Sequence, residues 1–287
     1  MNTTAAIQGN ITRLYPVPGT ETRLQGLYLE HRLHERSHAG RPYVFSNFIT
    51  TLDGRIAVAA DGRRSHEVPR QTANARDWRL YQELAAQADL LITSGRFLRQ
   101  TAAGEAQDIL PVSGQPVFAD LHDWRQQQGL ASQPDIAVLS SSLELPLAAF
   151  DNYRDRRVLV ITGTGAPRDK LRSLTDHGIE VVTAGNGLAV DGRMLAAELG
   201  NRGYRSIYAI AGPAVFSTLV AANVLDRLYL TVTHQLLSGD AYDTMTRGPA
   251  LAPACGMNMI NLYHDAHAPA GAGQWFCVFE PHTAQPD

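Results

Sequence analysis

Short apolar runs alternate along the chain with segments whose apolar residues recur at helical spacing. The apolar runs predict strands at residues 43–50, 89–93, 135–140, 157–162, 179–184, 206–211, 225–234 and 274–281. The helical spacing predicts helices at residues 24–36, 70–88, 95–100, 119–128, 167–177, 192–202 and 213–222. Because several strands are apolar throughout, we expect them to be buried on both faces. The pattern predicts an α/β fold with a mostly parallel central sheet and helices on both faces.

Three stretches outside these elements predict little regular structure. Residues 1–23 contain two prolines and a glycine close together and are interpreted as an irregular lead-in. Residues 59–70 are interpreted as a polar loop, and the stretch around His264 and His267 as loop-like. In such a stretch, solvated or capping roles for the two histidines are favoured over metal ligation.

Neither composition nor a linker divides the chain. We therefore predict one domain at residues 41–287, preceded by an N-terminal extension at residues 1–40. Trp78 and Tyr81 in the predicted helix 70–88 are separated by about one turn and are interpreted as core side chains rather than a stacking platform.

The bulk composition excludes several classes of function. The chain has 287 residues, of which 44% are hydrophobic and 18% charged, so it can bury a sizeable core. Its net charge of −3 gives no broad electrostatic reason to bind nucleic acid or an anionic membrane. The two cysteines, Cys255 and Cys277, are too far apart for C-x-x-C spacing, so neither a disulfide framework nor a zinc site is expected. No secretory pattern is recognisable, and we expect a cytoplasmic protein without a bound metal.

The loops that follow the predicted strands share small, hydroxyl-bearing or glycine residues. They are residues 51–55 (TLDGR), 94–96 (SGR), 140–142 (SSS), 163–165 (GTG) and 212–214 (GPA). In open α/β sheets, ligands bind outside the carboxyl ends of the strands. Small residues there let the backbone approach a phosphorylated cofactor closely.

The Gly212–Pro213 step is the clearest of these turns. Proline suits the first helical position because its missing N–H has no partner there anyway, and the next amides, from Ala214 to Phe216, are expected to face an anion. An ordinary strand–helix turn remains the alternative. Likewise, Arg96 either grips a phosphate or is a solvated cation, and Ser140 either contacts a phosphate or caps the following turn.

Four stretches in this order resemble one protein family. They are RPYVFSNFITTLDGRIA, ADLLITSGRF, DIAVLSSSLELP and LGNRGYRSIYAIAGPAVFSTLVAANVLDRLYLTVTHQLLSG. Together they resemble the RibD C-terminal family, the pyrimidine reductases of riboflavin biosynthesis, over roughly residues 41–240. The resemblance implies a dihydrofolate-reductase-like fold, a stand-alone reductase domain and a homodimer.

The resemblance further implies that NADPH is the hydride donor for a C=O or C=N bond of a small, pyrimidine-like substrate. The positions that match the family's cofactor contacts are Ser94, Gly95, Arg96, Ser140, Ser141, Thr162, Ala211, Gly212, Pro213, Ala214 and Val215. Asn47, Thr51 and Ser65 match substrate-side positions. Asp53 is the candidate for orienting or protonating the substrate, and holding its own turn is the alternative role.

Three positions depart from the family pattern. Ile210, Phe97 and Ala85 stand where polar contacts to the substrate are expected. A non-catalytic NADP(H)-binding protein that has lost its substrate contacts is therefore a second hypothesis. A short-chain-dehydrogenase-like enzyme built on the GTG turn is a third, but it predicts an N-terminal glycine fingerprint and a Tyr-x-x-x-Lys pair, and the sequence has neither.

Overall fold

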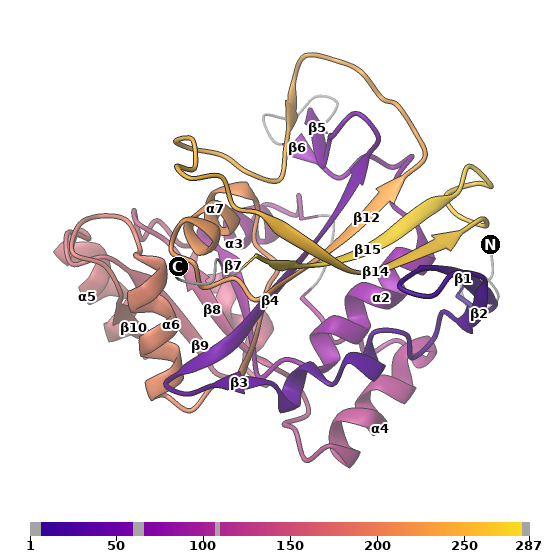
Figure 1. Ribbon diagram of the computed structural model, residues 1–287. Coiled ribbons are helices and arrows are strands. Elements are labelled where there is room, and N and C mark those ends of the chain that lie inside the picture. The colour runs from indigo at the N-terminus through magenta and orange to yellow at the C-terminus, as the bar shows by residue number, and fades with distance from the viewer. Residues whose placement is uncertain (1–6, 60–65, 107–109, 283–287) are drawn as a thin grey trace. The chain divides into compact units, whose positions relative to one another are not determined.

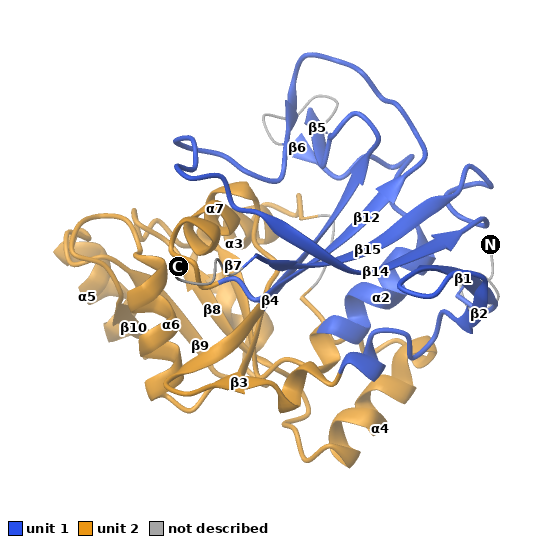
Figure 2. Ribbon diagram, in the orientation of Figure 1, with its two compact units in different colours: residues 1–31, 45–84, 225–287 blue, residues 32–44, 85–224 orange. Residues whose placement is uncertain are grey.

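The computed structural model describes residues 7–59, 66–106 and 110–282, which fall into two compact units (Figure 2). Unit 1 comprises residues 1–31, 45–84 and 225–287, and unit 2 comprises residues 32–44 and 85–224. Strand β4 (Arg41–Thr51) runs from unit 2 into unit 1. Among the described residues, no helix has the length and apolar character needed to span a membrane.

Unit 2 is built on a parallel sheet (Figure 1). Its strands lie in the order β10 (Glu180–Thr183), β9 (Val158–Thr162), β8 (Asp135–Leu139), β7 (Leu90–Ser94) and β11 (Ser206–Ala209). Each neighbouring pair in this series is parallel. The strands are mostly apolar, as expected for a parallel sheet that is covered on both faces.

Helices connect the strands of unit 2. They are α3 (Gly95–Ala102), α4 (Ala119–Gln127), α5 (Arg168–Asp176), α6 (Gly192–Asn201) and α7 (Pro213–Ala221), with 3-10 turns η2 (Leu33–Glu35), η3 (Pro116–Phe118) and η4 (Leu147–Tyr153). The short strand β3 (Ser37–His38) pairs with the start of β4. The side chain of Asp191 starts α6 by accepting hydrogen bonds from the amides of Arg193 and Met194, each at 2.9 Å. Gly178 ends α5 with φ +75°, the left-handed conformation typical of a helix C-terminus.

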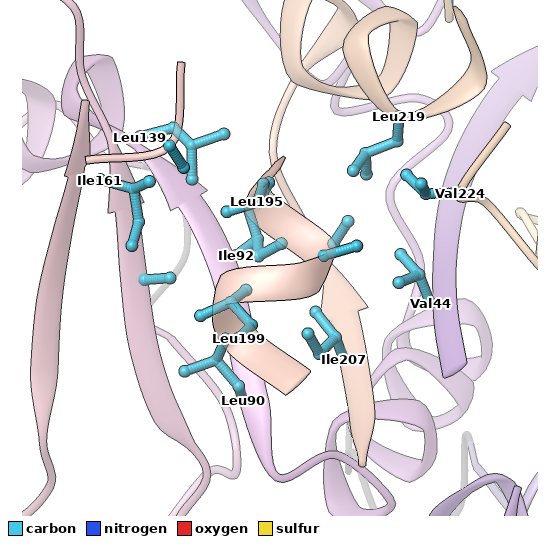
Figure 3. Packing of buried hydrophobic residues seen from close by; sticks show 14 of the residues in the cluster. Val44, Leu90, Ile92, Leu139, Ile161, Leu195, Leu199, Ile207, Leu219 and Val224 are labelled. Carbon is cyan, nitrogen blue, oxygen red and sulfur yellow. The ribbon is translucent and has the colours of Figure 1, made fainter. Parts of the chain in front are cut away.

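The core of unit 2 lies between this sheet and helices α6 and α7. Leu195 and Leu199 of α6 and Leu219 of α7 pack on Ile92 and Ile207 of the sheet (Figure 3). Each of these five side chains is at most 1% exposed. This packing fixes the carboxyl ends of the strands, where the predicted cofactor residues lie.

The sheet strands of unit 1 are mainly antiparallel, in contrast to those of unit 2. Strand β4 is parallel to β12 (Arg227–Thr233). Beyond β12 come β15 (Gln274–Pro281), β14 (Met257–Asp265), β1 (Asn10–Tyr15) and β2 (Thr20–Arg23), each antiparallel to its neighbour. A small second sheet joins β13 (Tyr242–Asp243), β5 (Ala57–Ala59) and β6 (His66–Glu67).

Helix α2 (Ala75–Ala86) has an unusually polar buried face in unit 1. Arg79 and Glu83 are both fully buried, with 2.8 Å between Arg79 Nε and Glu83 Oε1. Glu83 also accepts hydrogen bonds from the amides of Gly26 at 2.7 Å and Tyr28 at 3.0 Å. One carboxylate therefore ties the helix to the N-terminal segment.

Two aromatic side chains of α2 are less buried than predicted. Trp78 and Tyr81 are half-buried, which corrects their interpretation as core side chains. Their ring centroids are 4.8 Å apart and their planes differ by 13°, so the two rings stack on each other.

The α/β fold class is confirmed, whereas four local predictions are wrong. Within the described residues of the polar loop predicted at 59–70, Ala59 ends strand β5 and His66–Glu67 form strand β6. The helix predicted at 24–36 is two 3-10 turns, η1 (Leu29–His31) and η2, separated by Arg32 in the left-handed conformation with φ +48°. The lead-in at 1–23 contains β1 and β2, and the stretch around His264 is strand β14. These three strands carry many polar residues, so their stability comes from pairing across the sheet rather than from local preference.

Candidate active site

The predicted cofactor residues all lie in unit 2, and most follow the carboxyl ends of adjacent parallel strands. Ser94 ends β7, Ser140 follows β8 and Thr162 ends β9. The pairing register places Ser94 beside Leu139 and Leu139 beside Ile161, so the three strand ends are level. The structure therefore gathers these positions on one edge of the unit 2 sheet.

Gly95 and Ser140 are in direct contact at this edge. A Cβ atom at Gly95 would lie 3.0 Å from Ser140 Oγ and 2.9 Å from Leu145 Cδ2, so the position has no room for a larger side chain. Ser140 Oγ already accepts a hydrogen bond from the amide of Leu143 at 3.1 Å. Ser140 therefore caps the turn after β8, which is the alternative role considered for it.

Arg96 and Ser141 lie at the same edge and are exposed. Their polar groups are open to solvent, whereas Ser140 is only 8% exposed. An exposed guanidinium and an exposed hydroxyl near a strand end suit a phosphate group.

Gly212 and Pro213 start helix α7 as predicted, with Pro213 in the first helical position. A Cβ atom at Gly212 would meet nothing within 4 Å, so the backbone there is open. The amides of Val215 and Phe216 both donate to the carbonyl of Gly212, at 3.1 and 3.3 Å. The amides of Ala214, Val215 and Phe216 were expected to face an anion. Of these three, only the amide of Ala214 does not donate a hydrogen bond to the Gly212 carbonyl.

Thr162 is completely buried, and its hydroxyl has no hydrogen-bond partner within the described part of the chain. The GTG turn that follows it packs on the turn after β10. A Cβ atom at Gly163 would lie 1.9 Å from the carbonyl oxygen of Gly187, and one at Gly185 would lie 2.2 Å from that of Ala189. The glycines of this turn are thus explained by contact between two loops, without a dinucleotide.

Residues 51–54, which include the predicted substrate-side residues Thr51 and Asp53, form a tight turn in unit 1. The amide of Gly54 donates to the carbonyl of Thr51 at 3.0 Å, and Gly54 has φ +80°, which favours glycine. The hydroxyl of Thr51, which is 1% exposed, donates to Asp53 Oδ1 and accepts from the amide of Arg55 at 3.1 Å.

Asp53 has both carboxylate oxygens engaged. Oδ2 accepts from the amides of Leu237 at 3.2 Å and Ser238 at 2.9 Å and lies 2.7 Å from Arg55 Nη1. The hydrogen bond from Thr51 contributes most, and that from Ser238 next, to lowering the pKa of Asp53 below its usual value. A carboxyl group held ionised in this way is a poor proton donor, and the contacts support an orienting or turn-holding role.

Arg55 contacts the same distant segment as Asp53 does, namely the loop at residues 235–243. Its guanidinium donates to the carbonyl of Gly239 at 2.9 Å and lies 4.3 Å from the ring centroid of Tyr242. Asp53 and Arg55 together therefore fix the loop 235–243 against the motif. No local pattern in the sequence points to this loop, because its contacts join residues about 185 positions apart in the chain.

The remaining substrate-side predictions have separate positions. Asn47 is half-buried on β4, directly beside Tyr229 of β12 in the pairing register. Ser65 lies outside the described residues. Asn47, Thr51 and Asp53 thus belong to unit 1, and every predicted cofactor residue belongs to unit 2.

Comparison with known proteins identifies relatives of this chain. The family model described as the RibD C-terminal domain matches residues 42–261. A pyrimidine reductase-like protein from Corynebacterium diphtheriae has a similar structure, with TM-score 0.61 and 17% sequence identity over 84% of this chain and 92% of that chain. A search of curated protein sequences found no match.

Two further solved structures share the fold. RibD from Acinetobacter baumannii gives a TM-score of 0.58 at 18% identity, covering 85% of this chain and 59% of that chain. The riboflavin biosynthesis reductase Rib7 from Saccharomyces cerevisiae gives 0.57 at 10% identity, covering 90% of this chain and 99% of that chain. At sequence identities of 10–18%, the similarity to these three structures shows a shared fold alone.

Proposed function

Because the chain belongs to the RibD C-terminal domain family, we propose that it is an NADPH-dependent reductase of a C=O or C=N bond in a small, pyrimidine-like substrate. One observation carries this proposal: adjacent parallel strands of unit 2 end level with one another at small or glycine residues. An extended dinucleotide needs such an edge, because its phosphates must approach the backbone closely.

The residues at this edge fit NADPH. The open backbone at Gly212 and the amide of Ala214 offer donors at the start of α7. Arg96 and Ser141 are exposed and offer a cation and a hydroxyl for the phosphate that distinguishes NADPH from NADH. The buried hydroxyl of Thr162 lies below this edge and contributes to its packing rather than to its charge.

When bound, NADPH supplies a hydride to the carbon of the reducible bond. The chain's own residues then have to hold the substrate and exclude competing reactions. Asp53, Thr51 and Asn47 are the proposed substrate-side residues. Since Asp53 is ionised and fully engaged, its proposed role is to fix the loop 235–243 and to orient the substrate, and not to donate a proton.

Titration of NADPH fluorescence with the purified protein tests the cofactor. Gly212→Ala places a methyl group in open space at the proposed phosphate site, so the fold is retained and NADPH affinity falls about tenfold or more. Gly114→Ala also places a methyl group in open space and is the matched control, because the nearby Val112 bonds to Gln133 just before β8, at the other end of the strands. An Arg96→Ala variant is expected to lose affinity for NADPH more than for NADH. Absence of binding at millimolar NADPH would refute the proposal.

A non-catalytic NADP(H)-binding protein is the alternative. The observation that favours it is the complete engagement of Asp53 in the contacts of its own turn and loop. NADPH binding without hydride transfer to a panel of carbonyl compounds, imines and aminopyrimidines supports this alternative over the reductase.

We further propose a cytoplasmic homodimer. Leu14, Met259 and Trp275 are 38%, 37% and 36% exposed on neighbouring strands β1, β14 and β15 of unit 1. Large apolar side chains on adjoining strands suit a contact with a second copy of the chain. Light scattering coupled to size-exclusion chromatography tests this, and a mass of one chain at micromolar concentration contradicts it.

A further inference from the structure

A cavity opens at the end of the unit 2 sheet opposite the proposed cofactor edge. Its lining includes Asp89, Asp135, Arg157 and Arg205, which precede or begin strands β7, β8, β9 and β11. The pairing of these strands places their first residues side by side, so their amino ends form one edge. All of the lining residues belong to unit 2. The cavity volume of about 590 Å³ lies within the range of roughly 300–1,000 Å³ that is typical of ligand pockets.

Arg125 of α4 is a buried cation in the wall of this cavity. It is 1% exposed, and its guanidinium donates to backbone carbonyls that include those of Ala131 at 2.7 Å and Ala86 at 2.8 Å. Burial lowers the pKa of Arg125 to about 10, so the group is still charged at neutral pH. Within the described part of the chain, no carboxylate pairs with it and its Nη2 has no hydrogen-bond partner. Buried charges are normally paired, so this guanidinium has an unmet need for an anion.

Two carboxylates of the lining already have neutral donors. Asp89 Oδ2 accepts from the amides of residues 205 and 206, at 2.9 and 3.1 Å. Asp135 accepts from the amide of Arg157 at 3.1 Å and from the hydroxyl of Tyr204 at 2.7 Å. Neither carboxylate is therefore held by a guanidinium of the cavity, and Oδ1 of Asp89 is left to accept a further hydrogen bond.

The four arginines of the lining differ in whether their charge is paired. Arg157 and Arg202 both pair with Glu180, at 2.6 and 3.5 Å. The side chain of Arg205 is exposed and, among the described residues, forms no ion pair and no hydrogen bond. Arg125 and Arg205 are thus the two lining cations that have no carboxylate partner in this part of the chain.

A buried histidine in the same wall also has an unmet hydrogen bond. The side chain of His34 on η2 is 7% exposed, its Nε2 lies 3.2 Å from Gln128 Oε1, and its Nδ1 has no partner within the described residues. Burial lowers the pKa of His34, so the ring is neutral at neutral pH and Nδ1 can accept a hydrogen bond. The neighbouring carboxylate of Glu35 pairs with Arg32 at the surface. The cavity thus combines two unpaired cations with acceptors that lack a donor.

We propose that this cavity binds a small phosphorylated polyol, with its phosphate on Arg125 and Arg205 and its hydroxyl groups donating to Asp89 and His34. Guanidinium groups suit phosphate because their N–H donors match its oxygens in pairs. Inorganic phosphate alone fills only a small part of the cavity and brings few donors to the two acceptors. The cavity and the cofactor edge lie at opposite ends of the same strands, so this second site stands independently of the proposed reductase function.

Calorimetric titration of the full chain with glucose 6-phosphate tests the site, and glucose and inorganic phosphate represent the two halves of that probe. The wild-type protein is expected to bind glucose 6-phosphate at least about tenfold more tightly than either half. Arg205→Gln removes an exposed cation without breaking an ion pair, so the fold is retained, and affinity for glucose 6-phosphate is expected to fall about tenfold. Arg172→Gln removes an exposed arginine of α5 outside the cavity lining and is expected to leave the affinity unchanged.

The Gly212→Ala variant separates this cavity from the proposed cofactor edge. It alters the start of α7 at the other end of the strands and is expected to bind glucose 6-phosphate as the wild type does. A parallel loss of affinity in Gly212→Ala, an unchanged affinity in Arg205→Gln, or binding of glucose 6-phosphate no tighter than that of inorganic phosphate would overturn the inference. Absence of NADPH binding with a retained preference for glucose 6-phosphate refutes the reductase proposal alone.

Discussion

Removal of Glu83 tests the polar packing that holds α2 in unit 1. Glu83→Ala deletes a fully buried carboxylate that pairs with Arg79 and accepts the amides of Gly26 and Tyr28. Burial is the largest influence on Glu83 and raises its pKa, against the lowering by Arg79 and the two amides. The intact pair is therefore a small net contributor to stability, because desolvation offsets much of its attraction.

Removing one partner of the ion pair is expected to destabilise the protein by much more than the intact pair stabilises it. The variant leaves the buried Arg79 without this carboxylate and deprives two amides of their acceptor. Removing one partner of a buried ion pair typically costs about 3–5 kcal/mol, and we expect a loss in this range. With a urea m-value of about 3 kcal/mol/M, the midpoint falls by about 1–1.7 M. Glu83→Gln keeps one acceptor oxygen and is expected to lose about 1–3 kcal/mol.

Urea unfolding followed by tryptophan fluorescence and circular dichroism measures these losses, and coincident transitions support a two-state treatment. Glu35→Ala is the control, because Glu35 pairs with Arg32 at the surface, where 49% and 59% of the two side chains are exposed. An exposed ion pair contributes little to stability, because water screens its attraction. The reasoning fails if Glu83→Ala lowers the urea midpoint no more than Glu35→Ala does. Hydrogen exchange adds a local readout, since the amides of Gly26 and Tyr28 are expected to lose protection only in the Glu83 variants.

Two further predictions concern the turns of the candidate site. Since the pKa of Asp53 is lowered in the folded state, its contribution to stability is present above the pKa of an unfolded aspartate and is lost as pH falls through the folded value. The stability difference between wild type and Asp53→Asn, measured by urea unfolding, is therefore expected to shrink as pH falls below about 4, and a difference independent of pH contradicts this. Gly163→Ala places a methyl group 1.9 Å from the carbonyl oxygen of Gly187 and is expected to lower the free energy of unfolding by about 1–3 kcal/mol or more. Gly187→Ala meets nothing within 4 Å and is expected to change stability by less than about 0.5 kcal/mol; equal thermal midpoints for the two variants would contradict the contact between the loops.

The strands and helices of unit 2 could be predicted from the sequence alone. Continuous apolar runs such as residues 157–162 identify strands that are buried on both faces, and Gly178 and Pro213 mark a helix end and a helix start. The level strand ends also follow from the pattern, because parallel strands of similar length place their following loops on one edge. These features depend on local preference and burial, which a single sequence records.

The antiparallel half of unit 1 was decided by tertiary structure. Strands β1, β2 and β14 contain mixed polar and apolar residues, and only their pairing partners give them regular structure. The same applies to the predicted helix at 24–36, where the amides of Gly26 and Tyr28 bond to Glu83 instead of continuing a helix. Long-range acceptors compete successfully with local spacing here because the buried carboxylate offers charge-assisted hydrogen bonds.

For the candidate site, the sequence by itself determined where small residues and glycines follow strands, and which of them match a family of reductases. It did not determine what the side chains contact. Asp53 appears in the sequence as an acid in a turn, but the structure binds it to loop residues about 185 positions away, which lowers its pKa. At the opposite end of the unit 2 sheet, Arg125 carries no motif, yet its contacts with the carbonyls of Ala86 and Ala131 bury it in the wall of a cavity. The type of each residue is written in the chain, whereas its charge state and its neighbours depend on contacts that form only when distant segments pack together.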